Sequence, residues 1–286
     1  MKIFFLDFKK TRHFLAFATL LVGVGVVFAG LMLNANSRAV PNDLDPIATV
    51  PSPVVIAKPV TVTPEPKSFS SQGTVVNPKT KLHAIYKVKT ERKVVALTFD
   101  ISWGTKVPGP VMDILKKYGV KSTFFLSGPW ASKYPEFPQR LVQEGHEVAS
   151  HGNRHIDLDR ESRETVREEI LAAHRSLKKV TGLEANLIRT PNGAFNNMVL
   201  EVADQSGYKV IQWSADSLDW KKPGVDAIVN RVMDKVHPGA IILMHASDTC
   251  LQTPEALPRV LDGLKAKGYE LVTVSKLLEE GPGVVN

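Results

Sequence analysis

The sequence predicts an α/β protein built on a parallel sheet, and three observations support this fold class. Val94–Asp100 is a continuous apolar run that ends in an acid, as in strands buried on both faces. Segments of strand and helix character then alternate to the C-terminus, and several of the helical ones stop at glycine. Residues capable of acid, base or ligand chemistry follow nearly every predicted strand. This last feature favours a barrel, with an open doubly wound sheet as the alternative.

The alternation amounts to about seven strand–helix units. The predicted strands are Val94–Asp100, Ser122–Leu126, His146–Ser150, Ala185–Arg189, Lys209–Ala215, Ala240–Met244 and Glu270–Val274. The predicted helices are Pro110–Tyr118, Phe137–Gln143, Glu161–Val180, Met198–Gln205, Val225–Val236 and Glu255–Lys267. Lys81–Lys89 has the composition of a short strand or hairpin that leads into this domain. No glycine-rich phosphate-binding pattern follows the first strand, which disfavours a nucleotide site.

The N-terminal third is predicted to lie outside this domain, which spans residues 81–286. Residues 1–13 form a basic cytoplasmic leader, and Phe14–Leu33 is a run of twenty uncharged residues, long enough to span a bilayer core. We expect a transmembrane signal-anchor with the domain on the extracytoplasmic side of the cell membrane. A cleaved signal peptide and a secreted domain are the alternative. Residues 34–80 are proline-rich and are expected to form an extended linker, with a small β module over 50–80 as the alternative.

The charge is concentrated in the same N-terminal region. Residues 1–90 contain eleven basic and four acidic side chains, which accounts for the whole net charge of +7. The remainder is neutral, so the domain lacks the basic surface that nucleic-acid binding requires. Cys250 is the only cysteine, which excludes an intramolecular disulfide and a cysteine-rich metal site.

Two early motifs carry candidate ligands and a candidate base. His151-Gly-Asn-Arg-His155 places two imidazoles four residues apart directly after a predicted strand, where they can share a metal ion. Two solvated histidines are the ordinary alternative. Asp100 ends the first buried strand and is a candidate base, with a helix-capping role as its alternative.

Three later strand ends carry further candidates. The turn in Arg189-Thr-Pro-Asn-Gly193 can present backbone N–H groups to an oxyanion, or it is an ordinary turn beside a surface arginine. Asp216-Ser-Leu-Asp219-Trp220 offers a carboxylate to orient a histidine and an indole to hold a sugar ring, or a helix cap beside a packed tryptophan. His245 ends the sixth strand and suits a general acid, with a buried structural histidine as the alternative.

Taken in order, these motifs resemble the polysaccharide deacetylase family, carbohydrate esterases that share the chitooligosaccharide-deacetylase homology domain. The resemblance covers about residues 92–278 and implies an incomplete (β/α)7 barrel. It implies metal-dependent hydrolysis of N-acetyl groups on amino sugars of a cell-wall polysaccharide, peptidoglycan or chitin-like, with release of acetate. The run Thr-Phe-Asp-Ile-Ser-Trp-Gly, with the anchor and linker, looks most like membrane-attached sporulation deacetylases. That similarity implies a cell-wall glycan as partner and a role in spore wall maturation.

The resemblance also implies a role for each motif residue. The catalytic residues would be Asp100 as base, Arg189 as its partner, His245 as acid and Asp219 as the residue that orients His245. A divalent metal, usually Zn²⁺, would be held by His151 and His155. The substrate-binding residues would be Trp220, Leu243, Pro191, Asn192 and Gly193.

Two positions depart from the family pattern. Ile101 stands where the family has a second aspartate as third metal ligand, and Asn192 replaces the more usual tyrosine. Asp100, Asp216 or water would then complete the metal site, or metal binding is weak or lost. The alternative function is therefore an inactive glycan-binding or structural spore-wall protein on the same scaffold. A glycosidase with paired carboxylates is a further alternative, but it would not need the three histidines.

Overall fold

The computed structural model describes residues 82–285 of the chain. The predicted leader, membrane anchor and linker lie outside these residues. Within the described part, no helix is both long enough and apolar enough to cross a bilayer.

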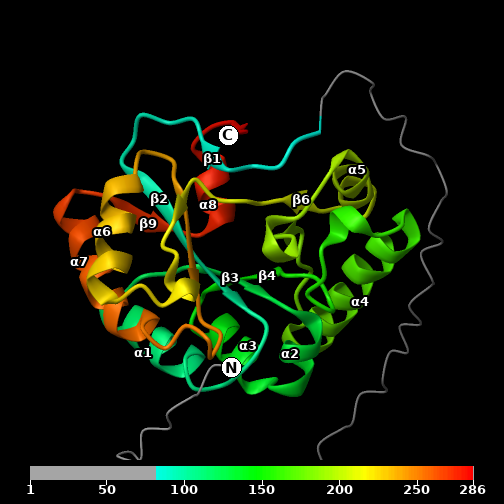
Figure 1. The fold of residues 1–286 in the computed structure, drawn as a ribbon, viewed down its shortest axis with the longest axis horizontal. Coiled ribbons are helices and arrows are strands. Elements are labelled where there is room, and N and C mark those ends of the chain that lie inside the picture. Colours follow the sequence, from blue (N-terminus) through cyan, green and yellow to red (C-terminus); the bar gives the residue numbers. More distant parts are fainter. Residues whose placement is uncertain (1–81, 286) are drawn as a thin grey trace, which may run out of the picture. The chain divides into compact units, whose positions relative to one another are not determined.

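The described chain alternates short strands with helices (Figure 1). The strands are β1 (Lys87–Val88), β2 (Val94–Ile101), β3 (Thr123–Leu126), β4 (Glu147–Ser150), β5 (Leu187–Ile188), β6 (Lys209–Val210), β7 (Ala215–Asp216), β8 (Ile241–His245), β9 (Glu270–Val272) and β10 (Gly283–Val284). The helices are α1 (Pro108–Tyr118), α2 (Gly128–Lys133), α3 (Glu136–Gln143), α4 (Arg163–Thr181), α5 (Asn197–Gln205), α6 (Val225–Lys235), α7 (Thr253–Ala266) and α8 (Val274–Glu279). Three single 3₁₀ turns are η1 (Leu158–Arg160), η2 (Pro191–Gly193) and η3 (Asp219–Lys221).

The main sheet is a barrel with one open seam. Its strand order is β6-β5-β4-β3-β2-β8-β7, and every pair that the order contains is parallel. If the two edges of this sheet are joined in a circle, the strands from β2 to β8 stand in the order of the sequence. Within this circle, β6 and β7 are the one neighbouring pair that is not hydrogen-bonded. This order fits the incomplete barrel expected above, rather than a doubly wound sheet, whose strand order reverses at a switch point. β9 pairs with the first half of β2, on the edge of β2 that pairs with β3 further along the strand.

The predicted strand Lys209–Ala215 is two separate strands, because the chain crosses the seam at this point. β6 and β7 lie at opposite edges of the sheet, and residues 211–214 join them. The backbone N–H of Ile211 donates to Ile188 on one side of the seam, and that of Ser214 donates to Ile241 on the other. A continuous strand would have kept Ala215 at the first edge.

The segment that enters the domain also lies at this seam. Ile85 forms a parallel bridge with Ile211, and Lys87 forms an antiparallel bridge with Ala240, just before β8. β1 then pairs with β10, so the two ends of the domain meet (Figure 1). The expectation of a short strand within Lys81–Lys89 is confirmed by β1.

The two faces of β2 have different surroundings, and this difference positions the site. Val95, Leu97, Phe99 and Ile101 belong to the large core that includes α1, α6 and α7. Val94 and Ala96 pack in a smaller cluster with Phe125, Leu187 and Ile241, inside the sheet. Because side chains alternate along a strand, Thr98 and Asp100 share the inner face. Ile101 faces the helices.

Candidate active site

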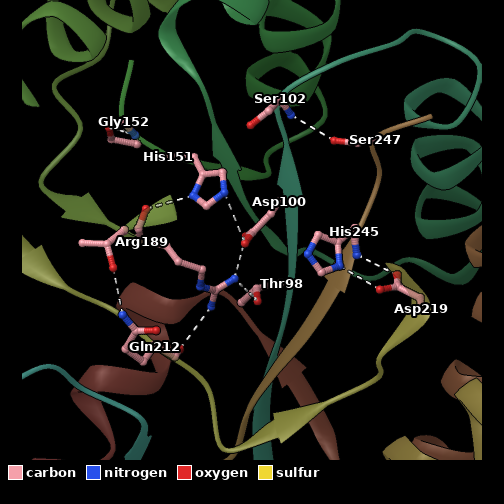
Figure 2. A network of polar contacts seen from close by, with 12 residues as sticks. Thr98, Asp100, Ser102, His151, Gly152, Arg189, Gln212, Asp219, His245 and Ser247 are labelled. Carbon is pink, nitrogen blue, oxygen red and sulfur yellow. Dashed lines mark hydrogen bonds and ion pairs between the residues drawn. The ribbon is translucent and has the colours of Figure 1, made fainter. Parts of the chain in front are cut away.

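Asp100 lies at the centre of a polar network at the carboxyl end of β2 (Figure 2). Its side chain is buried, and Oδ1 accepts a hydrogen bond from Nη1 of Arg189 at 2.7 Å. Burial alone would raise the pKa of this carboxyl. The positive charge and hydrogen bond of Arg189, with contributions from His151 and His245, outweigh burial and lower the pKa of Asp100. The carboxylate is therefore held ionised.

Arg189 is fully buried and pairs with more than Asp100. Nη1 also donates to Oγ1 of Thr98 at 2.9 Å, and Nη2 donates to the carbonyl of Gln212 at 3.2 Å. The guanidinium lies 4.1 Å from the centre of the Phe125 ring, a cation–π contact. The sequence did not single out Thr98 or Gln212. Thr98 could have been found from the sequence, because it lies two residues before Asp100 and therefore on the same face of the strand.

His151 is fixed in one tautomer by the backbone. Its Nδ1 lies 2.9 Å from the carbonyl oxygen of Arg189, and a carbonyl can only accept, so Nδ1 carries the proton. The lone pair is then on Nε2, which lies 3.6 Å from Oδ2 of Asp100. Burial lowers the pKa of His151 to about 4, against the opposing charge of Asp100. The imidazole is neutral at ordinary pH, the form that binds metals.

His155 lies next to His151 in a loop that Glu169 holds in place. The ring centroids of the two histidines are 5.1 Å apart, and the ring planes are inclined at 76°. Glu169 of α4 is buried, and its Oε2 accepts the backbone N–H groups of Asn153 at 3.2 Å and Arg154 at 2.7 Å. Its other oxygen accepts from the side chain of Arg154. Sequence analysis missed Glu169, although an acid within an apolar helix stripe was a signal.

On the other side of Asp100, Asp219 holds His245 (Figure 2). Oδ1 of Asp219 lies 2.7 Å from Nδ1 of His245, and Oδ2 accepts the backbone N–H of His245 and the hydroxyl of Thr253, both at 2.7 Å. Burial would lower the pKa of His245. The hydrogen bond and charge of Asp219 outweigh burial and raise this pKa. His245 therefore keeps a proton over a wider pH range than a free histidine.

The turn after β5 is rigid for steric reasons. Gly193 has φ of +70°, and a Cβ there would lie 3.0 Å from the ring of Trp213. Asn192 also has a positive φ of 56°, and its side chain donates to Oδ1 of Asp157 at 2.8 Å. The N–H of Gly193 is used within the turn, where it donates to Thr190. The backbone N–H of Asn192 is therefore the candidate oxyanion donor, while Pro191 is buried beneath it.

Strained backbone is concentrated around the site. In residues 82–285, the non-glycine residues with positive φ are His155, Asn192, Leu218 and Lys222. Each lies in a loop that carries a residue described above, and Leu218 and Lys222 flank η3, which contains Asp219 and Trp220. Such conformations cost about 1–3 kcal/mol each and persist where the surroundings fix them, often at functional sites.

Comparison with known proteins identifies the family. The model of the family described as polysaccharide deacetylase matches residues 87–211. The uncharacterized protein YlxY of Bacillus subtilis is 31% identical over 196 residues, which cover 68% of this chain and 60% of that protein. A peptidoglycan-N-acetylglucosamine deacetylase of Bacillus cereus is 34% identical over 199 residues, which cover 68% of this chain and 93% of that protein. The chain belongs to the polysaccharide deacetylase family. Deacetylases of this family are metal-dependent hydrolases that act on N-acetyl amide bonds.

The solved structures similar to this polysaccharide deacetylase chain include a protein without activity. BA3943 of Bacillus anthracis, described as a CE4 family pseudoenzyme, has a TM-score of 0.67 and 33% identity, with 71% of each chain covered. A BA3943 mutant described as having restored enzymatic activity has the same TM-score and 34% identity, covering 71% of this chain and 74% of that one. Membership of the family therefore does not by itself decide whether a site is active.

In this deacetylase domain, Ile101 lies away from the polar network. It is buried in the large core with Val107 and Leu126, on the face of β2 opposite to Asp100. An aliphatic side chain suits that apolar position, but it supplies no ligand atom. A bound metal would therefore have to be held by the remaining groups.

Two of those remaining groups fit a cation. The lone pair of His151 Nε2 and the ionised Oδ2 of Asp100 are 3.6 Å apart, and both are electron-rich. A positive ion between them would relieve this repulsion. The ring of His155 lies beside that of His151, but the donor atoms of Asp100, His151 and His155 do not all lie within 4.8 Å of one another. His155 would therefore have to move closer to complete a three-donor site of the kind that Zn²⁺ prefers.

A second group of ligand-type side chains does not suit a metal. Asp219, His245 and Cys250 are the one such trio in residues 82–285 whose donor atoms all lie within 4.8 Å of one another. Both oxygens of Asp219 are already occupied by hydrogen bonds. Burial raises the pKa of the Cys250 thiol to about 12, so it remains protonated and is a poor ligand.

The remaining predicted residues lie at the rim and the floor of the site. Trp220 is exposed and follows Asp219 in η3. Leu243 is buried in β8, where it pairs with Thr98 on one side and Asp216 on the other. Oδ1 of Asp216 accepts the backbone N–H of Leu218, so this carboxylate stabilises the η3 loop. The structure thus brings all the predicted catalytic residues around Asp100.

Proposed function

We propose that this protein removes N-acetyl groups from amino sugars of cell-wall glycan, most directly peptidoglycan, in a metal-dependent reaction that releases acetate. One observation carries the proposal. Asp100 lies between a neutral, tautomer-fixed His151 and a carboxylate-bound His245, so the site provides an anionic centre with a ligand group on one side and an acid on the other. A protein that only bound glycan would have no need of this arrangement.

A bound divalent ion would supply Lewis-acid polarisation of the acetamide and of a water molecule. It would be held by His151 and His155, next to Oδ2 of Asp100. The ionised Asp100 accepts the proton of the attacking water, whose oxygen forms a bond to the acetyl carbon. The N–H of Asn192 would donate a hydrogen bond to the developing oxyanion. Nε2 of His245 then donates a proton to the leaving nitrogen as the C–N bond breaks, giving acetate and a free sugar amine.

The setting of the reaction is also a proposal. The uncharged run Phe14–Leu33 supports attachment to the cell membrane, with the domain on the extracytoplasmic side where wall glycan lies. The similarity to peptidoglycan deacetylases supports peptidoglycan as the substrate. A part in spore wall maturation rests on the Thr-Phe-Asp-Ile-Ser-Trp-Gly run at Thr98–Gly104.

The direct test is acetate release from peptidoglycan and from chitooligosaccharides by the full-length protein. We expect release that stops with a chelator and returns with Zn²⁺ or Co²⁺. His151→Ala should abolish both release and metal binding while the fold, followed by circular dichroism, is retained. His174→Ala is a matched control, because His174 pairs with Tyr208 and Glu184 outside the site. Full activity in a metal-free His151→Ala variant would rule out the proposed mechanism.

A second candidate is a glycan-binding protein without catalytic activity, and the burial of Ile101 favours it. The similarity to the BA3943 pseudoenzyme supports the same alternative. Acetate release by the wild-type protein separates the two. Release that depends on an added divalent metal supports the enzyme, whereas glycan binding without release in the presence of Zn²⁺ or Co²⁺ supports the non-catalytic function.

A further inference from the structure

Large apolar side chains are exposed mainly at the edge of the sheet that carries the site. In residues 82–285 the exposed ones are Trp103, Leu183, Trp220, Leu251 and Val285. Trp103, Trp220 and Leu251 follow the neighbouring strands β2, β7 and β8. Asp100 and His245 lie at the ends of β2 and β8, and Asp219 lies in η3 directly after β7. Trp103 is 43% exposed and Trp220 is 49% exposed. Exposed apolar groups gathered at one edge are typical of a binding surface.

Trp103 is held on a loop that is fixed at several points. The backbone N–H of Ser102 donates to Oγ of Ser247 at 3.0 Å, and the carbonyl of Trp103 accepts the N–H of Asp248 at 3.2 Å. The carbonyl of Gly104 accepts the indole N–H of Trp130 at 2.7 Å. The exposed indole of Trp103 is therefore presented on a rigid backbone.

Asp248 completes this support from the end of β8. Its Oδ1 accepts the backbone N–H groups of Lys106 at 2.8 Å and Val107 at 3.1 Å. Gly104 has φ of +81°, and a Cβ there would lie 2.0 Å from Cγ of Asp248. The glycine thus allows the carboxylate to fit against the backbone of the Trp103 loop. A side chain that is ordered before binding loses little conformational entropy when a ligand arrives.

The position of Trp103 relates it to the reacting centre. Its ring centroid lies 5.3 Å from that of His155, with the planes inclined at 73°. The Trp103 ring thus contacts the loop that carries His151 and His155, whereas Trp220 follows Asp219, which holds His245. His151 and His245 lie on opposite sides of Asp100 (Figure 2). Two exposed indoles from opposite sides of one centre suit a ligand longer than a single sugar.

We infer that Trp103 is a sugar-binding platform, whose indole face stacks on the pyranose ring of the glycan residue next to the one that reacts at Asp100. This inference rests on the proposed function, and it adds that the ligand is a glycan chain rather than a free amino sugar. Indoles suit this task, because the apolar C–H face of a pyranose packs on the ring while the sugar hydroxyls remain in water.

The test is calorimetric binding to the full-length protein with a chelator present, so that no turnover occurs. The probes are N-acetylglucosamine and chitotetraose. We expect the wild-type protein to bind chitotetraose more tightly than the monosaccharide. Trp103→Ala should weaken chitotetraose binding roughly tenfold and leave monosaccharide binding unchanged. Trp103→Phe should retain most of the affinity, and Leu183→Ala, an exposed apolar control outside this edge, should retain all of it.

Three results would overturn the inference: chitotetraose affinity unchanged in Trp103→Ala, an equal loss for both probes, or no preference of the wild-type protein for the longer probe. Acetate release by the wild-type protein, measured in parallel without chelator, tests the proposed function separately. If the wild-type protein released acetate but Trp103→Ala bound chitotetraose as tightly as the wild type, the role of Trp103 would be rejected and the proposed deacetylase activity would stand. Trp103-dependent binding without release would keep the platform and reject the deacetylase.

Discussion

The two histidines on either side of Asp100 have opposite electrostatic surroundings. His151 donates to a neutral carbonyl, and burial lowers its pKa to about 4. His245 faces the ionised Asp219, whose charge and hydrogen bond outweigh burial and raise its pKa. The same side chain is thereby made a neutral ligand on one side and a proton donor on the other. The partner of Nδ1 differs between the two rings, a carbonyl for His151 and a carboxylate for His245, and burial is outweighed only in His245.

The largest effect should follow from Arg189→Met, which leaves Asp100 buried without its partner. We expect the free energy of unfolding to fall by about 3–5 kcal/mol, measured by urea denaturation. The double variant Asp100→Asn/Arg189→Met should recover much of this loss. Arg175→Met is the control, because its pair with Glu168 is exposed and should contribute less than about 1 kcal/mol. If Arg189→Met lowered the free energy of unfolding no more than Arg175→Met does, the buried pair of Arg189 and Asp100 would not be needed for the stability of the fold.

Removing the acid should affect the reaction instead of the fold. His245→Ala should lower kcat for acetate release by roughly 10²–10⁴-fold, the usual contribution of a positioned general acid. The free energy of unfolding should change much less than in Arg189→Met, because the side chain of His245 is 22% exposed. If kcat fell less than about tenfold, another group would have to protonate the leaving amine.

A smaller effect, on metal affinity, is expected at Glu169. This residue of α4 holds the loop that carries His151 and His155 but is not part of that loop. Glu169→Gln weakens the bonds to the N–H groups of Asn153 and Arg154 and so loosens His155. Metal affinity should fall by about 10–100-fold, measured by competition with a chelating dye. The adjacent Glu168→Gln is the matched control, since the Glu168 side chain is 65% exposed. Equal affinity in the two variants would contradict a positioning role for Glu169.

The dependence of stability on pH should distinguish the contributions of His245 and Asp100. Because its pKa is raised, His245 contributes stability that is fully present below its unfolded pKa and is lost as pH rises through the folded pKa. Asp100 has a lowered pKa and contributes stability above its unfolded value, lost as pH falls through the folded one. Asp219→Asn should lower the pKa of His245, followed by NMR titration, and move the alkaline limb of activity to lower pH. An unchanged titration would mean that Asp219 does not control His245.

Much of the fold was predictable, because long runs with one periodicity specify their own structure. Val94–Asp100 and Glu161–Val180 correspond to β2 and α4 within a few residues. Lys209–Ala215 was predicted wrongly as one strand, because a composition rich in strand formers does not reveal that the chain crosses a seam. The short helices α2 and α8 were missed, since each spans six residues and is stabilised mainly by tertiary packing.

The site residues that the sequence indicated are those at strand ends, where topology alone brings them together. The supporting residues were missed because their partners are distant in sequence. Thr253 and Asp219 are separated by 34 positions, and Asp248 and Lys106 by 142. The tautomer of His151 was equally inaccessible, because it depends on the position of one carbonyl, that of Arg189. The roles of these residues remain predictions that the experiments above would test.

The described chain enters the domain at the end of the barrel opposite to the catalytic edge. Lys87 and Val88 join the backbone of Gly239 and Ala240, immediately before β8, whereas His245 ends that strand. The entry point and the catalytic edge are therefore at opposite ends of the same strand. Within the described residues, the segment that leads into the domain therefore leaves the catalytic edge uncovered, so a long glycan could reach Asp100 without passing this segment.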